Sequence, residues 1–364
     1  MFWLLFLDFL TTRILAEPLP IEQLRYVAVL FRHGERGPLF DFSSNKARSH
    51  FKNKTGQLTE KGKQQATQFG EYLNKRYYDG KGKALITKIH STNKSRCLES
   101  GELILKTIFP ENSTILKPKI ELFAQNDIDW VICIYEFEFK MIKMFYVLQL
   151  PVNECQKQVT ALKKWCPGLK NASDYVKYDD LAAELLMCTR EFKSSKFFTK
   201  SSDIVQIEAL VAEVNAGLIA PTAETFEAEK IMQGMHELSE GYGAYVEDVV
   251  AKTSSGQLIS ILYNEVIAER NETLVHFVST QDWIIASSMQ ILGVSDFLQH
   301  RNPPYLSSLT VEAWGKGERG KIKIFYQMLN ATGTIQRVKE LALDEFTRRF
   351  SYLKDFDVKE YCKE

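Results

Sequence analysis

The sequence has 364 residues, of which 45% are hydrophobic and 25% are charged, a composition typical of a folded globular protein. Its 46 lysines and arginines balance 46 aspartates and glutamates, so no overall field draws it to nucleic acid or to an anionic membrane. Beyond the N-terminal region, no segment offers the roughly 20 apolar residues that a membrane-spanning helix needs. Any binding of an anion must therefore come from a local cluster of donors.

The first 16 residues resemble a secretory signal peptide. An apolar run covers residues 2–7, and Ala16 is a small residue suited to cleavage. Asp8 and Arg13 are unusual in such a segment, so a wrongly assigned start codon is the alternative. We expect a secreted or lysosomal glycoprotein, because six Asn-x-Ser/Thr triplets fit export. These triplets begin at Asn53, Asn93, Asn112, Asn171, Asn271 and Asn330.

The first predicted element of the mature chain is a buried strand at 26–31. Its six residues form a continuous β-prone apolar run that ends abruptly in charge and glycine, as in a central parallel strand covered on both faces. Thr59 is then a suitable N-cap for a helix. The residues that recur at helical spacing along one face of this helix are Ala66, Phe69, Gly70 and Leu73.

Two further strand–loop–helix units follow along the chain. The second has a strand at 85–89 and a helix that reaches about residue 108, and the third has a strand at 274–278 and a helix at 283–292. Three such units predict an α/β fold in which helices flank a parallel-rich sheet and ligands bind beyond the C-terminal ends of the strands. Residues 309–314 and 321–326 flank a glycine-rich turn and predict a hairpin.

The central part of the sequence lacks this alternation of strand and helix. Residues 119–259 are Lys/Glu-rich with mostly helical patterns, although the segment 131–149 predicts no element. We interpret the region as a mostly helical cap inserted into the core. The expected division is therefore a signal peptide at 1–16, an α/β core at 17–118 plus 260–364, and a cap at 119–259.

The chemically distinctive segment is 32–38, Arg-His-Gly-Glu-Arg-Gly-Pro, directly after the first strand. Phosphate monoesters are anionic, so an enzyme that cleaves them needs positive donors, an in-line nucleophile and an acid for the leaving alcohol. Arg32 and Arg36 provide planar, permanently charged donors, and His33 provides a nucleophilic ring nitrogen that is neutral near its ordinary pKa of about 6.5. A bare Arg-His-Gly is more often a solvated turn. The longer pattern after an apolar strand favours a phosphate site.

The pattern Arg-His-Gly-x-Arg-x-Pro resembles the signature of the histidine acid phosphatases, which form branch 2 of the histidine phosphatase superfamily. Three other segments are also similar to that family: Gly-Gln-Leu-Thr at 56–59 with Gly62 after it, Ser-Thr at 91–92 with Arg96, and Pro-Pro-Tyr at 303–305. The similarity covers roughly 20–115 and 260–330 and is faint in the insertion. Within the family the sequence looks most like the prostatic, lysosomal and insect venom acid phosphatases.

The resemblance implies hydrolysis of small phosphorylated substrates through a phosphohistidine intermediate on His33. It also implies that Arg32, Arg36 and Arg96 bind the phosphoryl group, without a metal or other cofactor. For Arg96 the alternative is an exposed arginine at the start of a helix. Because two-fold dimers are common in the family, a homodimer is the assembly that the resemblance suggests, although the sequence itself leaves the oligomeric state open.

The third unit departs from the family at one position. The family usually has His-Asp where this chain has Gln281-Asp282. By the resemblance, Asp282 protonates the leaving oxygen, which is worth about 10² to 10⁴ in rate. Gln281 can donate to the phosphate only without charge, at a loss of about 1 kcal/mol, and we expect activity reduced roughly ten- to a hundred-fold. The rival hypothesis is an inactive secreted protein that binds phosphorylated ligands.

The cysteines and the remaining histidines offer no second chemistry. Without Cys-x-x-Cys spacing, the cysteines argue against a zinc site, and they lie at Cys97, Cys133, Cys155, Cys166, Cys188 and Cys362. The resemblance implies a Cys155–Cys362 disulfide first and Cys166–Cys188 second, and it marks 131–149 as inserted.

Residues 315–321 match part of a nucleotide-binding loop, but a strand follows, so a turn is favoured. The other histidines, His90 among them, are expected to be structural.

Overall fold

The computed structural model describes residues 24–122, with gaps at 40–41, 53, 79–85 and 111–117, and residues 249–363, with gaps at 299–302 and 331–332. Between these ranges it describes 209–219, except 211 and 215, and the single residues 157, 160, 163, 168, 170 and 171. The expected signal peptide, the segment 131–149 and most of the expected helical cap therefore lie outside the described residues.

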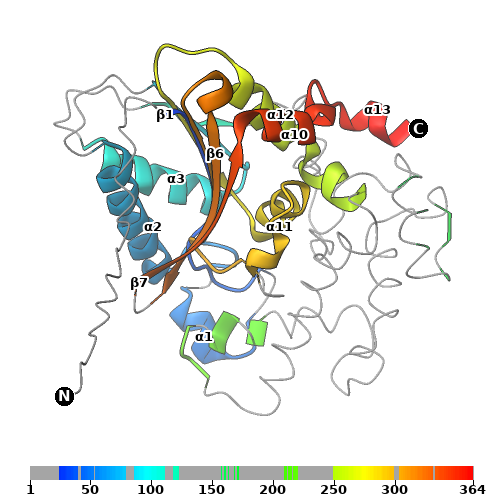
Figure 1. Cartoon of the computed structure of the whole chain (residues 1–364). Coiled ribbons are helices and arrows are strands. Elements are labelled where there is room, and N and C mark those ends of the chain that lie inside the picture. The colour runs from blue at the N-terminus through cyan, green and yellow to red at the C-terminus, as the bar shows by residue number, and fades with distance from the viewer. Residues whose placement is uncertain are drawn as a thin grey trace, which may run out of the picture.

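Seven strands in the described part of the chain form one mixed sheet in the order β3-β2-β4-β1-β5-β6-β7 (Figure 1). They are β1 (Leu24–Arg32), β2 (Ile86–Ser91), β3 (Glu121–Leu122), β4 (Leu274–Thr280), β5 (Ser308–Trp314), β6 (Lys321–Asn330) and β7 (Gly333–Ala342). The strands β3, β2, β4 and β1 are parallel, and β5, β6 and β7 continue the sheet antiparallel. This confirms the predicted α/β class. The predicted hairpin is β5 and β6, to which the structure adds β7.

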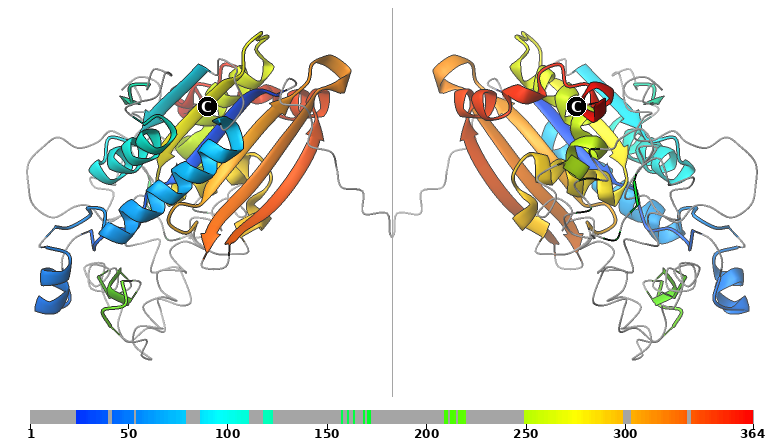
Figure 2. Two further views of the ribbon diagram at one scale, coloured as in Figure 1. Left: turned by 90° about the vertical axis from the view of Figure 1, so that its left-hand side faces the viewer. Right: turned by 90° about the vertical axis from the view of Figure 1, so that its right-hand side faces the viewer.

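Helices cover both faces of the sheet (Figures 1 and 2). One face carries α2 and α3, and the other carries α10, α11 and α12. The helices are α1 (Asn45–His50), α2 (Glu60–Leu73), α3 (Ser95–Ile108), α10 (Val249–Ile267), α11 (Asp282–Ile291), α12 (Leu343–Arg349) and α13 (Val358–Lys363). Shorter turns of other helix types are Asn74–Tyr78, Ser295–Leu298, Gly317–Arg319 and Ser351–Leu353. All three predicted strand–loop–helix units are present.

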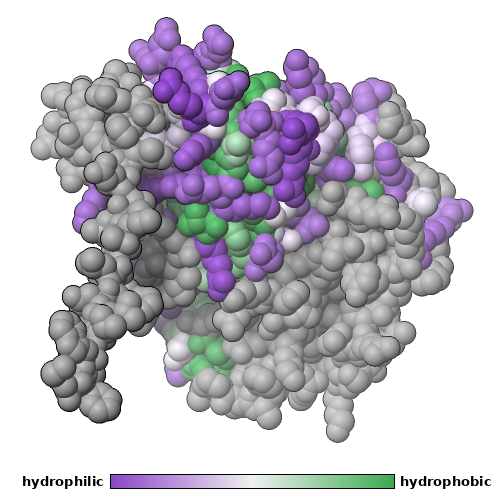
Figure 3. All heavy atoms as spheres, in the orientation of Figure 1, coloured by the Kyte–Doolittle hydropathy of each residue, from purple (hydrophilic) through white to green (hydrophobic). Residues whose placement is uncertain are grey.

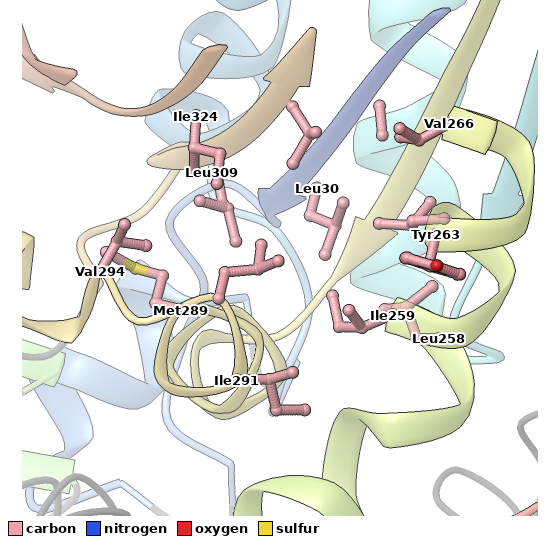
Figure 4. Close-up of a cluster of buried hydrophobic side chains, with 14 of the residues drawn as sticks. Leu30, Leu258, Ile259, Tyr263, Val266, Met289, Ile291, Val294, Leu309 and Ile324 are labelled. Carbon is pink, nitrogen blue, oxygen red and sulfur yellow. The ribbon is translucent and has the colours of Figure 1, made fainter. Parts of the chain in front are cut away.

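The strand β1 separates two hydrophobic cores because successive side chains of a strand point to opposite faces. Its whole length is buried. Tyr26, Ala28 and Leu30 contact the core under α10 and α11, whereas alternate residues face α2 and α3. Figure 4 shows Leu30 among the aliphatic side chains of the first core. Each such fully buried side chain contributes about 1.5–3 kcal/mol to folding, so β1 is firmly fixed where the loop after it begins.

The helix α2 begins where the sequence predicts. The Thr59 hydroxyl accepts a hydrogen bond from the Gly62 N–H at 3.0 Å, which satisfies one of the free donors of the first turn. The predicted apolar stripe of this helix is buried. The helix is therefore held against β1, with its N-terminus beside the loop that follows the strand.

Polar side chains cover much of the coloured surface in Figure 3. The exposed large hydrophobic residues in the described part of the chain are scattered at Ile86, Val338 and Tyr352. None of the helices within the described residues has the length and apolar character needed to span a membrane.

Candidate active site

Three loops meet at the C-terminal edge of the parallel strands. The loop after β1 carries His33, the loop after β2 leads into α3 and Arg96, and the end of β4 leads into α11. The loops are hydrogen-bonded to one another, since the His33 N–H donates to the Thr280 carbonyl at 3.1 Å. The structure brings the six residues predicted from the sequence to this edge: Arg32, His33, Arg36, Arg96, Gln281 and Asp282.

The ring of His33 is buried and held in one tautomer. Its Nδ1 lies 2.8 Å from the Gly34 carbonyl, which can only accept, so Nδ1 carries the proton. Its Nε2 accepts a hydrogen bond from Arg96 Nε at 3.0 Å. Burial, and then the positive charges of the three neighbouring arginines, hold the pKa of His33 well below 6.5. The ring is therefore neutral, with the Nε2 lone pair directed toward Arg96.

Arg32 is held on three sides. Its Nη2 pairs with the Asp282 carboxylate at 2.8 Å, and its Nη1 donates to the Pro303 carbonyl at 2.7 Å. Its guanidinium carbon lies 4.1 Å from the centroid of the Tyr305 ring, a cation–π contact. The remaining donor, Nε, is buried and has no hydrogen-bond partner among the described residues. An acceptor beside this Nε–H would satisfy it.

Gln281 and Asp282 occupy the start of α11. Gln281 is the N-cap residue, and its Oε1 accepts a hydrogen bond from Arg96 Nη2 at 3.0 Å. Its Nε2 is buried without a hydrogen-bond partner in the described part of the chain. A buried donor of this kind costs about 1–3 kcal/mol when unsatisfied, so the pocket favours an acceptor at this position. The N-terminus of α11 adds a further partial positive charge.

The loop after β1 packs very closely against the first turn of α2. A Cβ atom on Gly34 would overlap the Gly62 carbonyl, and a Cβ on Gly62 would overlap the Glu35 carbonyl. The Thr59 N–H also donates to the Glu35 carbonyl at 2.9 Å, and the Gly34 N–H donates to the Ser100 hydroxyl at 3.1 Å. Only glycine at both positions allows this approach, which fixes the backbone immediately after His33.

Sequence reasoning missed the parts played by Tyr305 and Ser100. The Tyr305 ring lies 5.8 Å from the His33 ring, centroid to centroid, as well as against Arg32. Ser100 follows Arg96 by one helical turn, and that spacing on α3 was the one available signal for it. The signal for Tyr305 was the Pro-Pro-Tyr match at 303–305, but its contacts could not be foreseen, because His33 and Arg32 lie more than 270 positions away in the sequence.

A pair of histidines lies within the sheet on the side of α10. His90 Nδ1 and His276 Nε2 are 2.7 Å apart, and His276 Nδ1 is 3.3 Å from the Tyr26 hydroxyl. His90 Nε2 lies 3.4 Å from Glu121. Burial, and then the charge that His90 can carry, lower the pKa of His276 to about 3. None of these contacts involves the six predicted site residues.

Cys362 takes part in a disulfide, but its partner is not among the described residues. Cys155, Cys166 and Cys188 lie outside the described residues, so both pairings stay predictions. Cys97 is a free, buried thiol on α3, and burial raises its pKa to about 11. A thiol in that state is a poor nucleophile.

A neutral buried histidine among three arginines, at the C-terminal edge of a parallel sheet, is an arrangement suited to the transfer of phosphoryl groups. The model of the family described as "Histidine phosphatase superfamily (branch 2)" matches residues 23–327. The chain therefore belongs to this family of phosphatases, as the resemblance of its motifs implied.

Individual relatives agree with this assignment. The chain is 24% identical over 328 residues to "Putative acid phosphatase 1" of Caenorhabditis briggsae, with 84% of this chain and 72% of the relative covered. It is 24% identical over 324 residues to "Prostatic acid phosphatase" of Rattus norvegicus, with 85% and 80% covered. Among solved structures, a phytase from Klebsiella sp. ASR1 matches with a TM-score of 0.57 at 15% identity, covering 92% of this chain and 96% of that one. At this identity the match shows the fold alone.

Proposed function

We propose that this protein is an acid phosphatase that hydrolyses phosphate monoesters through a phosphohistidine on His33. The observation that carries the proposal is the hydrogen bonding of His33 Nε2 and of the donors near it. That atom is unprotonated, and the buried donors Arg32 Nε and Gln281 Nε2 lack partners among the described residues. A phosphoryl group supplies the acceptors that these donors lack.

In the first step, His33 Nε2 attacks phosphorus and the bond from phosphorus to the ester oxygen breaks. The leaving oxygen takes a proton from Asp282, and the ring becomes a phosphorylated imidazolium with its proton on Nδ1. The Gly34 carbonyl, which already accepts from Nδ1 at 2.8 Å, stabilises the positive charge that develops on the ring. In the second step, water attacks phosphorus and gives its proton to Asp282, the bond from phosphorus to nitrogen breaks, and inorganic phosphate leaves.

The arginines neutralise the phosphoryl oxygens throughout. In the free site, Arg96 Nε donates to the attacking nitrogen, and Arg32 Nη2 is paired with Asp282. Substrate oxygens replace His33 as the acceptor for Arg96, which frees the lone pair for attack. Arg32 can offer its Nε–H to the phosphate while Nη2 keeps its contact with Asp282, so one side chain aligns the acid and the phosphoryl group.

The proposal is tested by trapping the intermediate. The wild-type protein, His33→Ala and the control His90→Ala are mixed with ³²P-labelled phenyl phosphate at acidic pH and quenched in alkali, which preserves phosphohistidine. We expect label on the wild type and on His90→Ala, at a peptide containing His33, and none on His33→Ala. Absence of label and of released phosphate from the wild type would contradict the proposal. Tight phosphate binding without release would support the inactive binding protein instead.

We further propose that the protein is exported and glycosylated. The acceptor residues Asn93 and Asn271 are exposed in the structure, which is what the attachment of a sugar requires. Expression in a eukaryotic secretory host, followed by enzymatic removal of N-linked sugars, would shift the mass of an exported glycoprotein. An unshifted mass would contradict glycosylation, and retention in the cytosol would contradict export.

A further inference from the structure

The chain between Pro38 and Gly56 leaves the phosphate site and returns to it; we call residues 39–55 the excursion. Its two ends are joined by hydrogen bonds, from the Gly37 N–H to the Gln57 carbonyl at 3.0 Å and from the Gly56 N–H to the Pro38 carbonyl at 2.7 Å. The helix α1 lies within the excursion. The base of the excursion is therefore fixed at the site, and contacts elsewhere must hold the rest.

One of the phosphate-binding arginines depends on the packing of the excursion. Phe51, at the end of α1, is buried directly against Gly37: a Cβ atom added there would lie 3.1 Å from its ring. The Gly37 carbonyl accepts a hydrogen bond from Arg36 Nη1 at 2.9 Å. A displacement of α1 therefore moves Phe51, and through Gly37 it changes the position of the Arg36 guanidinium.

The far end of the excursion is tied to the segment 209–219 through Glu213. The carboxylate of Glu213 is fully buried and accepts two hydrogen bonds from Ser43, one from its N–H at 2.8 Å and one from its hydroxyl at 2.6 Å. A third contact joins the same two segments, from Lys46 Nζ to the Leu218 carbonyl at 3.1 Å. Figures 1 and 2 show this segment, in green, near α1.

The segments 39–55 and 209–219 are joined by directed hydrogen bonds and not by packing alone. Two hydrogen bonds from Ser43, one to each oxygen of the Glu213 carboxyl group, fix the orientation of Ser43 as well as its position. The neighbouring Ser44 is the N-cap of α1, with its hydroxyl accepting from the Ala47 N–H at 3.1 Å. Glu213 therefore orients the residue immediately before the cap of α1, where the direction of that helix is set.

We propose that Glu213 is a positioning residue for phosphate binding: by holding Ser43 and α1 in place, it keeps the guanidinium of Arg36 in position near His33. The inference rests on the proposed phosphatase function, because it concerns the same pocket. It gives the segment 209–219 a direct part in the affinity for phosphate, although this segment is remote in sequence from every residue that contacts the phosphoryl group in the proposed mechanism.

The test compares two buried glutamates. Glu312 on β5 is also buried, and its carboxylate accepts hydrogen bonds from Arg76, Tyr77 and Trp314, away from the excursion. The variants Glu213→Gln, Ser43→Ala and Glu312→Gln are compared with the wild type by kcat and KM for phenyl phosphate. Two further measurements are the inhibition constant of inorganic phosphate, which reports the phosphate pocket without a leaving group, and the melting temperature.

We expect Glu213→Gln to raise KM and the inhibition constant about fivefold, and Ser43→Ala about twofold, with kcat within about twofold of the wild type. Glu312→Gln should lower the melting temperature and leave the inhibition constant unchanged. If Glu213→Gln lowers only the melting temperature, Glu213 is structural and the inference is wrong. Ser43 is exposed, so we expect Ser43→Ala to fold even if Glu213→Gln does not. An unchanged inhibition constant for Ser43→Ala refutes the inference. A wild type that neither hydrolyses phenyl phosphate nor binds phosphate overturns the proposed function itself.

Discussion

The close approach of two glycines beside His33 makes Gly62→Ala a sensitive test of the site. A Cβ atom on Gly62 would overlap the Glu35 carbonyl oxygen and lie 2.8 Å from the Glu35 amide nitrogen. Ordinary contacts between carbon and a carbonyl oxygen lie at about 3.3–3.6 Å, so the loop or the helix must move by roughly 1.5 Å. Both atoms belong to the backbone, and no rotation of a flexible side chain relieves the overlap.

Two opposing effects on stability can be compared. Helix propensity alone favours alanine over glycine in α2 by about 1 kcal/mol. Overpacking of this kind costs about 1–3 kcal/mol, so we expect net destabilisation or at best no change. The effect on catalysis is larger, because a shift of about 1 Å in a positioned nucleophile can lower the rate about 10²-fold.

The assay is the initial rate of hydrolysis of phenyl phosphate at acidic pH, with the melting temperature measured in parallel. Gly168→Ala is the matched control, because a Cβ added at Gly168 meets no atom within 4 Å. We expect kcat/KM of Gly62→Ala to fall about 10²-fold and that of Gly168→Ala to stay unchanged. A Gly62→Ala protein that keeps wild-type kcat/KM with a raised melting temperature would show that the loop does not need this contact.

Three further outcomes are expected. The neutral ring of His33 is lost only as the pH falls through its lowered pKa, so the acid limb of kcat/KM should lie well below pH 6.5. Arg96→Gln removes one charge that lowers this pKa and should move the limb to higher pH; an unmoved limb would show that another group titrates. Asp282→Asn should lower kcat for glycerol phosphate about 10²- to 10⁴-fold. It should lower kcat for 4-nitrophenyl phosphate less than tenfold, because 4-nitrophenolate leaves without a proton. Equal losses of kcat for the two substrates would contradict the role of Asp282 as acid. Gln281→His should raise kcat/KM for phenyl phosphate about tenfold, because histidine offers a charge-assisted donor. Loss of the hydrogen bond from Arg96 limits this gain. Steady-state kinetics that show no gain would refute this account.

Local sequence signals were sufficient for the centre of the fold. The apolar run that becomes β1 and the charged segment after it are adjacent in sequence, so strand, loop and His33 could be predicted together. The strand β7 was missed because it is an edge strand, with Val338 exposed and charged residues on either side of it. A strand of this kind lacks the clean alternation that identifies a half-buried one.

Contacts between distant segments were beyond the reach of such signals. Glu213 and Ser43 are 170 residues apart, and neither the apolar residues around Glu213 nor the polar residues around Ser43 mark the two as partners. The His90–His276 contact depends on the register of β2 against β4. His276 lies directly opposite Lys88, and His90 is its diagonal neighbour on the adjacent strand. A sequence predicts strands far more readily than their register.

The buried His276 has a consequence for how long the protein survives where it is expected to work. Its pKa is about 3 when folded and about 6.5 when unfolded, so the stability contributed by its neutral form is present above pH 6.5 and is lost as the pH falls toward 3. At pH 5 the loss is about 2 kcal/mol, a large part of the margin of a typical domain. A ligand present at 100 times its dissociation constant restores about 2.7 kcal/mol. Inorganic phosphate is the product of the proposed reaction, so by binding the folded enzyme it would offset this loss of stability in acid. The same product would slow turnover by inhibition and extend the lifetime of the folded enzyme.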